Sequence, residues 1–318
     1  MPPDKQKPNE EIKRVTFSFT APPPRGAPNQ HEVSTMKIAF CNEVFGNWAL
    51  EKQFECIASA GYDGVELAPF TLDEAFSSGA EANADVKRIS AARRSEICRL
   101  AEQNKLEVSG LHWLLAKTTG LHLTSADADQ RNRTAEYFKD LIRFGAEVGG
   151  KYLVLGSPVQ RNLAEGVTLE EGYDRAASVL EQLLPLLEET NQILGLEPLA
   201  PVETNFLNTA HQALDLITKM GNPGPITIHL DCKAMADGES RPIPEVIADP
   251  AIVPFEKTFH AQDPNMKGPG FGDLDFGPIL AALKKNGFSG WIGVEPFDYS
   301  DGPDVLCKNS IDYLKSVG

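Results

Sequence analysis

Basic residues are scarce in this sequence. Of its 318 residues, 30 are Lys or Arg and 45 are Asp or Glu, which gives a formal charge of −15 at pH 7. A protein that binds a nucleic-acid backbone normally presents clustered Lys and Arg side chains. The composition therefore disfavours general nucleic-acid binding and favours chemistry on small molecules.

Cysteine pairs and long apolar runs are also missing. The five cysteines are odd in number and form no Cys-x-x-Cys motif, which favours reduced thiols over a disulfide framework and disfavours a cysteine zinc site. No stretch approaches the ~20 apolar residues that span a bilayer, and the first residues lack the order of a secretory signal. We therefore expect a cytoplasmic protein that does not bind membranes.

Hydrophobic periodicity is absent from residues 1–35, which contain seven prolines. A segment of this composition buries too little apolar surface to fold by itself. We predict that residues 1–35 form a flexible, Pro-rich extension and that residues 36–318 form one catalytic domain.

Residues 36–318 alternate short strand-like runs with longer helical segments, which is typical of βαβ units in a parallel sheet. The predicted strands are 36–42, 64–69, 107–113, 152–157, 193–199, 226–232, 256–262 and 291–297. Eight sequential right-handed units of about 35 residues each close into a barrel. The sequence therefore predicts an α/β protein with a (β/α)8 TIM barrel; a doubly wound open sheet is the alternative.

Four polar residues stand near the C-terminal ends of the last four predicted strands: Glu197, Asp231, His260 and Glu295. Side chains alternate along a strand, so each of these shares its face with the residue two positions earlier. Those earlier residues are small or polar, as the interior of a barrel allows: Gly195, His229, Thr258 and Gly293. Since barrel active sites assemble at the C-terminal strand ends, the pattern predicts three carboxylates and an imidazole aimed at one point.

A divalent metal explains such a set, because three adjacent carboxylates would otherwise repel one another. Oxygen ligands with one imidazole suit Mn²⁺, Mg²⁺ or Co²⁺ better than a structural zinc. For any one of these residues alone, the alternative is a helix cap or a hydrogen-bonded core residue.

Four further residues are candidates for substrate contacts: His112, Arg161, Glu203 and Lys233. They follow or end predicted strands, so the barrel would direct them toward the same mouth. A buried hydrogen bond is the alternative for His112, and a solvated loop side chain is the alternative for Arg161 and Lys233. The glycine-rich segment 267–273 could also present backbone N–H groups to an anion.

The chain from Met36 onward resembles the xylose isomerase-like barrel superfamily of sugar isomerases and epimerases. In that family a Glu on strand 5, an Asp on strand 6, a His on strand 7 and a Glu on strand 8 bind one divalent metal. The resemblance maps these ligands, in that order, onto Glu197, Asp231, His260 and Glu295. It further implies that Glu197 and Glu295 act as the acid/base pair and that Glu203 contacts the substrate.

Two positions depart from the ketose 3-epimerases of this superfamily. Those enzymes carry a His three residues after the metal-binding Asp and an Arg six residues after the metal-binding His. The corresponding residues here are Ala234 and Met266. The departures disfavour a free-ketose 3-epimerase and leave the metal-binding set intact.

The resemblance implies a metal-dependent sugar isomerase or epimerase that moves a proton next to a ketone through a metal-stabilised enediolate. A carboxylate on each face of the substrate would remove and return that proton. Its partners would be a sugar or keto-polyol substrate, with one Mn²⁺, Mg²⁺, Co²⁺ or Zn²⁺ ion, and relatives commonly form homo-oligomers. The alternatives are a lyase or dehydratase acting on a keto-sugar or keto-inositol, a non-catalytic binding subunit, and an apurinic endonuclease. The endonuclease would need more than the six histidines present.

Overall fold

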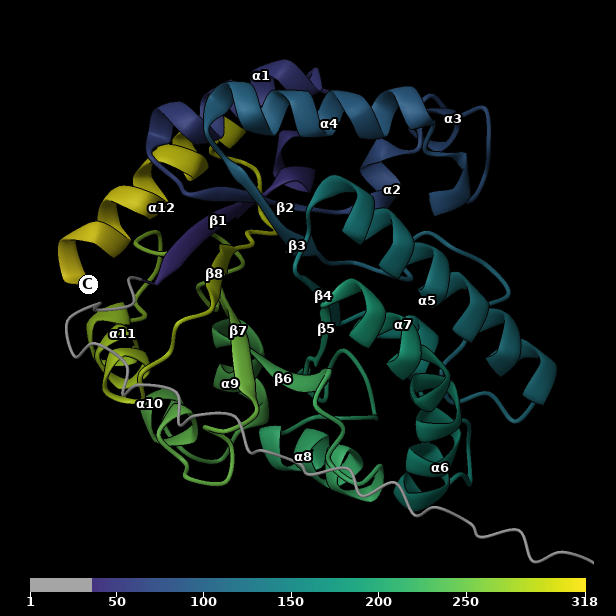
Figure 1. Ribbon diagram of the computed structural model, residues 1–318. Coiled ribbons are helices and arrows are strands. Elements are labelled where there is room, and N and C mark those ends of the chain that lie inside the picture. The colour runs from purple at the N-terminus through teal and green to yellow at the C-terminus, as the bar shows by residue number, and fades with distance from the viewer. Residues whose placement is uncertain (1–35) are drawn as a thin grey trace, which may run out of the picture. The chain divides into compact units, whose positions relative to one another are not determined.

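The computed structural model describes residues 36–318, which form a closed barrel of parallel strands (Figure 1). Each strand pairs with the next along the chain, and the last pairs with the first. The strands are β1 (Lys37–Cys41), β2 (Gly64–Leu67), β3 (Glu107–Leu111), β4 (Tyr152–Leu155), β5 (Ile193–Leu196), β6 (Ile226–Asp231), β7 (Glu256–Ala261) and β8 (Trp291–Val294). The predicted TIM barrel is confirmed, and every strand lies within its predicted range. The predicted flexible extension, residues 1–35, lies outside the described residues.

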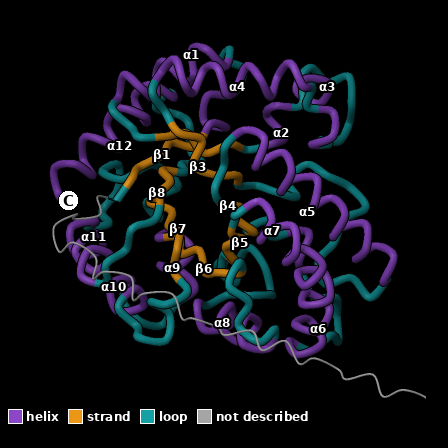
Figure 2. Tube along the Cα trace, in the orientation of Figure 1, coloured by secondary structure: helices purple, strands orange, loops and turns teal. Residues whose placement is uncertain are grey.

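Helices surround the strands on the outside of the barrel (Figure 2). The α-helices are α1 (Leu50–Ala60), α2 (Pro69–Leu72), α3 (Glu74–Ser77), α4 (Ala91–Asn104), α5 (Ala128–Val148), α6 (Leu169–Leu180), α7 (Leu184–Thr190), α8 (Ala210–Lys219), α9 (Cys232–Gly238), α10 (Ile243–Ile247), α11 (Phe276–Lys285) and α12 (Pro303–Val317). Four 3₁₀ turns, η1 (Asn42–Phe45), η2 (Val86–Arg88), η3 (Val159–Arg161) and η4 (Glu181–Leu183), complete the described part. Within residues 36–318, no helix is both long enough and apolar enough to cross a bilayer.

Local sequence fixes the helix ends. At the start of α6, the Thr168 hydroxyl accepts the Glu171 N–H at 3.2 Å, and the Glu171 carboxylate accepts the Thr168 N–H at 2.8 Å. This reciprocal capping box satisfies two backbone donors that the first turn of a helix leaves free. At the other end of a unit, α5 stops where Gly149 takes a φ of 93°, a left-handed conformation that glycine adopts without strain.

The two ends of the barrel interior differ in the polarity of their side chains. A large apolar core fills the space between strands and helices. Inside the barrel, a small apolar cluster of Ala39, Tyr152, Val154 and Trp291 occupies the end where the strands begin. The apolar cluster leaves the C-terminal strand ends to a group of polar side chains, at the end where TIM barrels carry their active sites.

Candidate functional site

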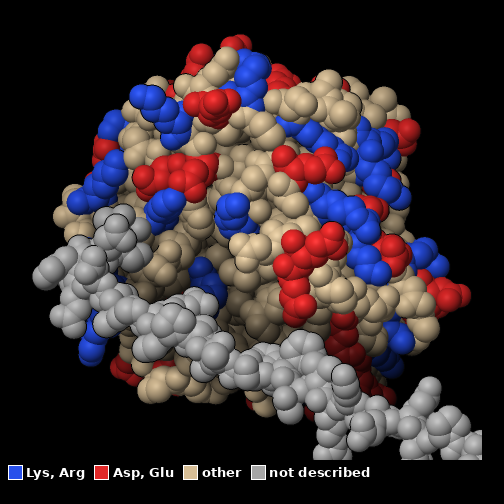
Figure 3. Space-filling view, in the orientation of Figure 1, with Lys and Arg blue, Asp and Glu red and all other residues tan. Residues whose placement is uncertain are grey.

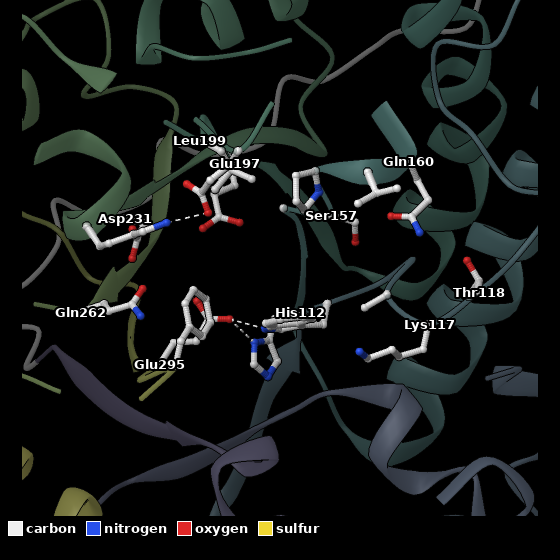
Figure 4. A pocket seen from close by; sticks show the side chains of 18 residues that line it. His112, Lys117, Thr118, Ser157, Gln160, Glu197, Leu199, Asp231, Gln262 and Glu295 are labelled. Carbon is white, nitrogen blue, oxygen red and sulfur yellow. Dashed lines mark hydrogen bonds and ion pairs between the residues drawn. The ribbon is translucent and has the colours of Figure 1, made fainter. Parts of the chain in front are cut away.

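The four predicted metal ligands come together at the C-terminal ends of β5 to β8. Glu197 and Glu295 directly follow β5 and β8, Asp231 ends β6, and His260 is the penultimate residue of β7. One donor atom from each of the four lies within 4.8 Å of the others. All four residues are buried, with at most 6% of their surface exposed. In Figure 4, Glu197, Asp231 and Glu295 face a common cavity.

Glycines on the inward face make room for these side chains. A Cβ added at Gly293 would lie 2.5 Å from Glu66 Oε2 and 2.7 Å from His260 Cδ2. A Cβ at Gly156, just after β4, would lie 1.7 Å from Glu197 Oε2. Both distances are shorter than any real Cβ contact, so the geometry of the cluster depends on glycine at these positions.

Glu295 is held by two neighbouring side chains from the segment after β3. Its Oε1 atom lies 2.8 Å from His112 Nδ1 and accepts a hydrogen bond of 2.7 Å from Trp113 Nε1. Its other oxygen lies 2.9 Å from His260 Nδ1. His112 is itself flanked by Glu43, because His112 Nε2 lies 3.0 Å from Glu43 Oε2. His112 and Trp113 therefore hold the Oε1 atom of Glu295, and its Oε2 atom faces the cluster.

The His260 ring is fixed from its far side. Its Nε2 atom lies 3.1 Å from Glu66 Oε1, and the Tyr152 hydroxyl donates to Glu66 Oε2 at 2.7 Å. Carboxylates commonly hold the second nitrogen of a metal-binding histidine in this way, which fixes the orientation of the ring. The arrangement leaves Nδ1 of His260 directed at the cluster.

Burial and like charge act together on the cluster. Burial, reinforced by Glu295, raises the pKa of Glu197 to about 8, and burial also raises the pKa of Asp231 to about 7. Burial also raises the pKa of Glu295, but His260 and His112 outweigh this effect and hold it below its ordinary value. The two glutamates differ because His260 Nδ1 is 2.9 Å from Glu295 and 4.0 Å from Glu197.

These residues fit a divalent cation. Asp231 Oδ2 and His260 Nδ1 are buried without a hydrogen bond, although His260 Nδ1 lies close to Glu295. Buried polar atoms without partners are costly, and so are adjacent buried carboxylates. A divalent ion would relieve both costs, and three carboxylates with one imidazole match the preferences of Mn²⁺, Mg²⁺ or Co²⁺.

A cavity of about 560 Å³ opens onto the cluster, and three of the four predicted substrate residues line it: His112, Glu203 and Lys233. Lys233 Nζ lies 2.6 Å from Glu203 Oε1, and the lysine side chain is only 5% exposed. The predicted alternative of a solvated loop lysine is therefore wrong for Lys233.

On the face shown in Figure 3, Lys and Arg side chains are interspersed with Asp and Glu, and the described residues form no continuous basic stripe there.

Arg161 is the predicted substrate residue that the structure places elsewhere. It is fully buried and does not line the cavity. Its Nη1 atom donates to the carbonyl oxygens of Leu155 at 3.2 Å and Glu197 at 2.7 Å. The turn η3 places this side chain against the backbone at the ends of β4 and β5, so Arg161 supports the backbone at Glu197.

The glycine-rich segment 267–273 does not surround an open anion site. Gly272 of this segment packs against the buried carboxylate of Asp263, which accepts the N–H groups of Asn265 and Leu274, on either side of the segment, each at 3.2 Å. A Cβ at Gly272 would lie 1.9 Å from Asp263 Oδ1. The space beside Gly272 is therefore filled by a carboxylate of the chain itself.

Sequence reasoning missed three residues of the site: Glu43, Trp113 and Gln262. Trp113 and Gln262 line the cavity, and Glu43 flanks His112. Trp113 also has a φ of 52°, a conformation that a bulky residue adopts only under constraint. Each of the three stands at or just after the end of a predicted strand, which is the same positional signal that led to the four predicted metal ligands.

Comparison with known proteins agrees with this geometry. Residues 54–317 match the family model described as xylose isomerase-like TIM barrel, and the chain belongs to this family. It is 24% identical to a D-psicose 3-epimerase of Enterocloster bolteae over 287 residues, which cover 86% of each chain.

Solved structures share the fold at lower identity. A 3-keto-D-glucoside 4-epimerase from E. coli superposes with a TM-score of 0.74 at 19% identity, over 89% of this chain and 100% of the other. A D-psicose 3-epimerase from Clostridium cellulolyticum H10, solved with D-tagatose, gives a TM-score of 0.72 at 19% identity, over 89% and 99% of the two chains.

Proposed function

We propose that this chain is a divalent-metal-dependent sugar isomerase or epimerase that moves a proton at a carbon next to a ketone. The observation that carries the proposal is the convergence of Glu197 and Glu295 with Asp231 and His260 at one cavity. The names of the relatives support the reaction class, since they include epimerases of D-psicose and of a 3-keto-D-glucoside.

In this proposal the two glutamates transfer the proton. They come from β5 and β8 and stand on different sides of the cavity (Figure 4). A keto-sugar bound between them presents one face of its reacting carbon to each carboxylate. One glutamate removes the proton to give an enediolate and the other returns a proton to the opposite face; each positioned transfer contributes about 10²–10⁴-fold to the rate.

The remaining residues bind and orient. Glu197, Asp231, His260 and Glu295 would hold the ion, which when bound stabilises the negative charge that develops on the substrate oxygens. The buried Lys233 and the partly exposed Glu203 form an ion pair at the side of the cavity, where they can hold substrate hydroxyl groups. His112 keeps Glu295 in place and lines the same cavity.

The test is exchange of deuterium from solvent into candidate substrates. Purified protein loaded with Mn²⁺, Co²⁺, Mg²⁺ or Zn²⁺ is incubated in D₂O with D-psicose, D-fructose, D-tagatose, L-ribulose or a 3-keto-D-glucoside, and exchange is followed by NMR. We expect exchange at the carbon next to the ketone with at least one sugar, and its loss after chelation. A product that has lost water would instead identify the lyase alternative.

The variants Glu197→Gln and Glu295→Gln test the two proposed proton carriers. Each should lower the exchange rate by about 10²–10⁴-fold. Glu256→Gln is the matched control, because Glu256 is also a buried glutamate but begins β7, at the opposite end of the barrel. Wild-type exchange in both site variants, or none with any metal, would contradict the proposal.

A further inference from the structure

Gln262 lines the cavity on the same face of β7 as His260. It directly follows β7 and stands two positions after His260, so the two side chains share the inward face of the strand. In the sheet, β7 lies between β6, which ends in Asp231, and β8, which leads into Glu295. Gln262 is therefore one step nearer the mouth than His260, and Figure 4 shows it beside Asp231 and Glu295.

The Gln262 amide is buried without a partner. The residue has 0% exposed surface and lines the cavity, yet neither Nε2 nor Oε1 makes a hydrogen bond. Two other buried glutamines of the described chain each donate a hydrogen bond, Gln53 to the Trp48 carbonyl and Gln192 to the Gly150 carbonyl, although Gln192 Oε1 also lacks a partner. Because an unsatisfied buried amide destabilises a fold, an amide that lines a ligand cavity is suited to pair with the ligand.

The chemistry of the amide defines the group that it would recognise. Nε2 donates and Oε1 accepts, so a group that satisfies both must also donate and accept, as a hydroxyl does. A phosphate or carboxylate accepts only, and it would be repelled by the carboxylates of Glu197, Asp231 and Glu295. Two lysines line the cavity: Lys233 is paired with Glu203, and Lys117 is exposed and lies across the cavity from Gln262 in Figure 4.

We propose that Gln262 is a specificity-determining residue that hydrogen-bonds a neutral hydroxyl at the reacting end of the substrate. This inference rests on the proposed function, because it takes the bound molecule to be a keto-sugar. The substrate is then unphosphorylated at that end. A site built to pair with a hydroxyl discriminates strongly against an analogue that lacks it.

Binding to the metal-loaded protein tests the proposal. The probes are the five sugars of the exchange panel, the monodeoxy analogues of the sugar that binds most tightly, and its phosphate ester at the reacting end; dissociation constants come from calorimetry. In the wild type, removal of one particular hydroxyl should weaken binding by roughly 10- to 100-fold. In Gln262→Met, which keeps the length but removes both polar atoms, that ratio should fall to within about threefold.

Two controls separate recognition from folding. Gln192→Met replaces a buried glutamine away from the cavity and should keep the wild-type discrimination between sugar and deoxy analogue. Gln262→Met should unfold at the wild-type temperature or above it, because it removes two unsatisfied polar atoms. A clear loss of thermal stability in Gln262→Met would show a structural role and overturn the proposal.

The remaining outcomes are also decisive. Equal discrimination in wild type and Gln262→Met, tighter binding of the phosphate ester, or no binding of any panel sugar would overturn the role of Gln262. Deuterium exchange without a Gln262-dependent hydroxyl effect would overturn this inference alone. Binding with that effect but without exchange would overturn the proposed catalysis and leave recognition by Gln262 standing.

Discussion

Gly293→Ala is the sharpest test of how the barrel interior supports the cluster. The new methyl group would meet Glu66 Oε2 at 2.5 Å and His260 Cδ2 at 2.7 Å. Neither neighbour can withdraw freely, since Tyr152 holds Glu66 and Glu295 lies against His260. Overpacking of this kind costs about 1–3 kcal/mol. For a barrel of this length, that corresponds to a fall in Tm of roughly 2–5 °C.

The same substitution should weaken metal binding. Displacement of His260 or of the carboxylate behind it typically lowers metal affinity by about 10–100-fold. The assay combines thermal unfolding of the chelated protein with competition titration of Mn²⁺ or Co²⁺. Gly224→Ala is the control, because a Cβ there meets no atom within 4 Å. If Gly293→Ala matched this control in both Tm and metal affinity, the packing described around His260 would be refuted.

Further predictions concern other parts of the site. Trp113→Phe removes the hydrogen bond to Glu295 Oε1 and should lower kcat by about tenfold with a small change in Tm, as measured by steady-state kinetics. Arg161→Met removes the bond to the Glu197 carbonyl and should lower the free energy of unfolding by about 1–3 kcal/mol in urea titrations. Chelated protein should lose stability as pH rises from 5 to 8, because Glu197 and Asp231, whose pKa values are about 8 and 7, bind more protons in the folded state than in the unfolded state. Thermal scans should show a weaker slope with metal bound.

The strands and the convergence of the four predicted metal ligands could be predicted for the same reason. Parallel strands are buried on both faces, so they appear as short apolar runs between helical segments. Once eight such runs close into a barrel, position along each strand decides which side chains reach the mouth. Glu197, Asp231, His260 and Glu295 meet in the structure because each stands at that position.

The supporting residues were harder to predict because their roles depend on contacts between distant segments. Arg161 follows β4 as expected, but only the path of η3 decides that its side chain donates to the Glu197 carbonyl. Glu43 and His112 lie 3.0 Å apart although they follow different strands. Gln262 carries no charge, and its importance lies in the absence of a hydrogen-bond partner, which a sequence does not reveal.

The two positions that depart from the ketose 3-epimerases, Ala234 and Met266, leave the four-residue cluster in place although their side chains differ. At position 234 an Ala stands where those enzymes carry a His. The Ala234 backbone N–H donates to Asp231 Oδ1 at 2.6 Å and so orients the carboxylate. At Met266, the side chain is 40% exposed, while its carbonyl oxygen accepts the N–H groups of Phe297 and Asp298 at 2.7 and 2.8 Å. Both positions therefore support the cluster through the backbone.

Recognition must then come from other side chains of the cavity. The charged candidates are the ion-paired Lys233 and Glu203 and the exposed Lys117, and Gln262 is a neutral candidate. A paired lysine presents little free positive charge, and an amide prefers a hydroxyl. Together with three nearby carboxylates, Gln262 and the ion-paired Lys233 favour a neutral, hydroxyl-bearing group over an anionic one beside the cluster, whichever sugar supplies those hydroxyls.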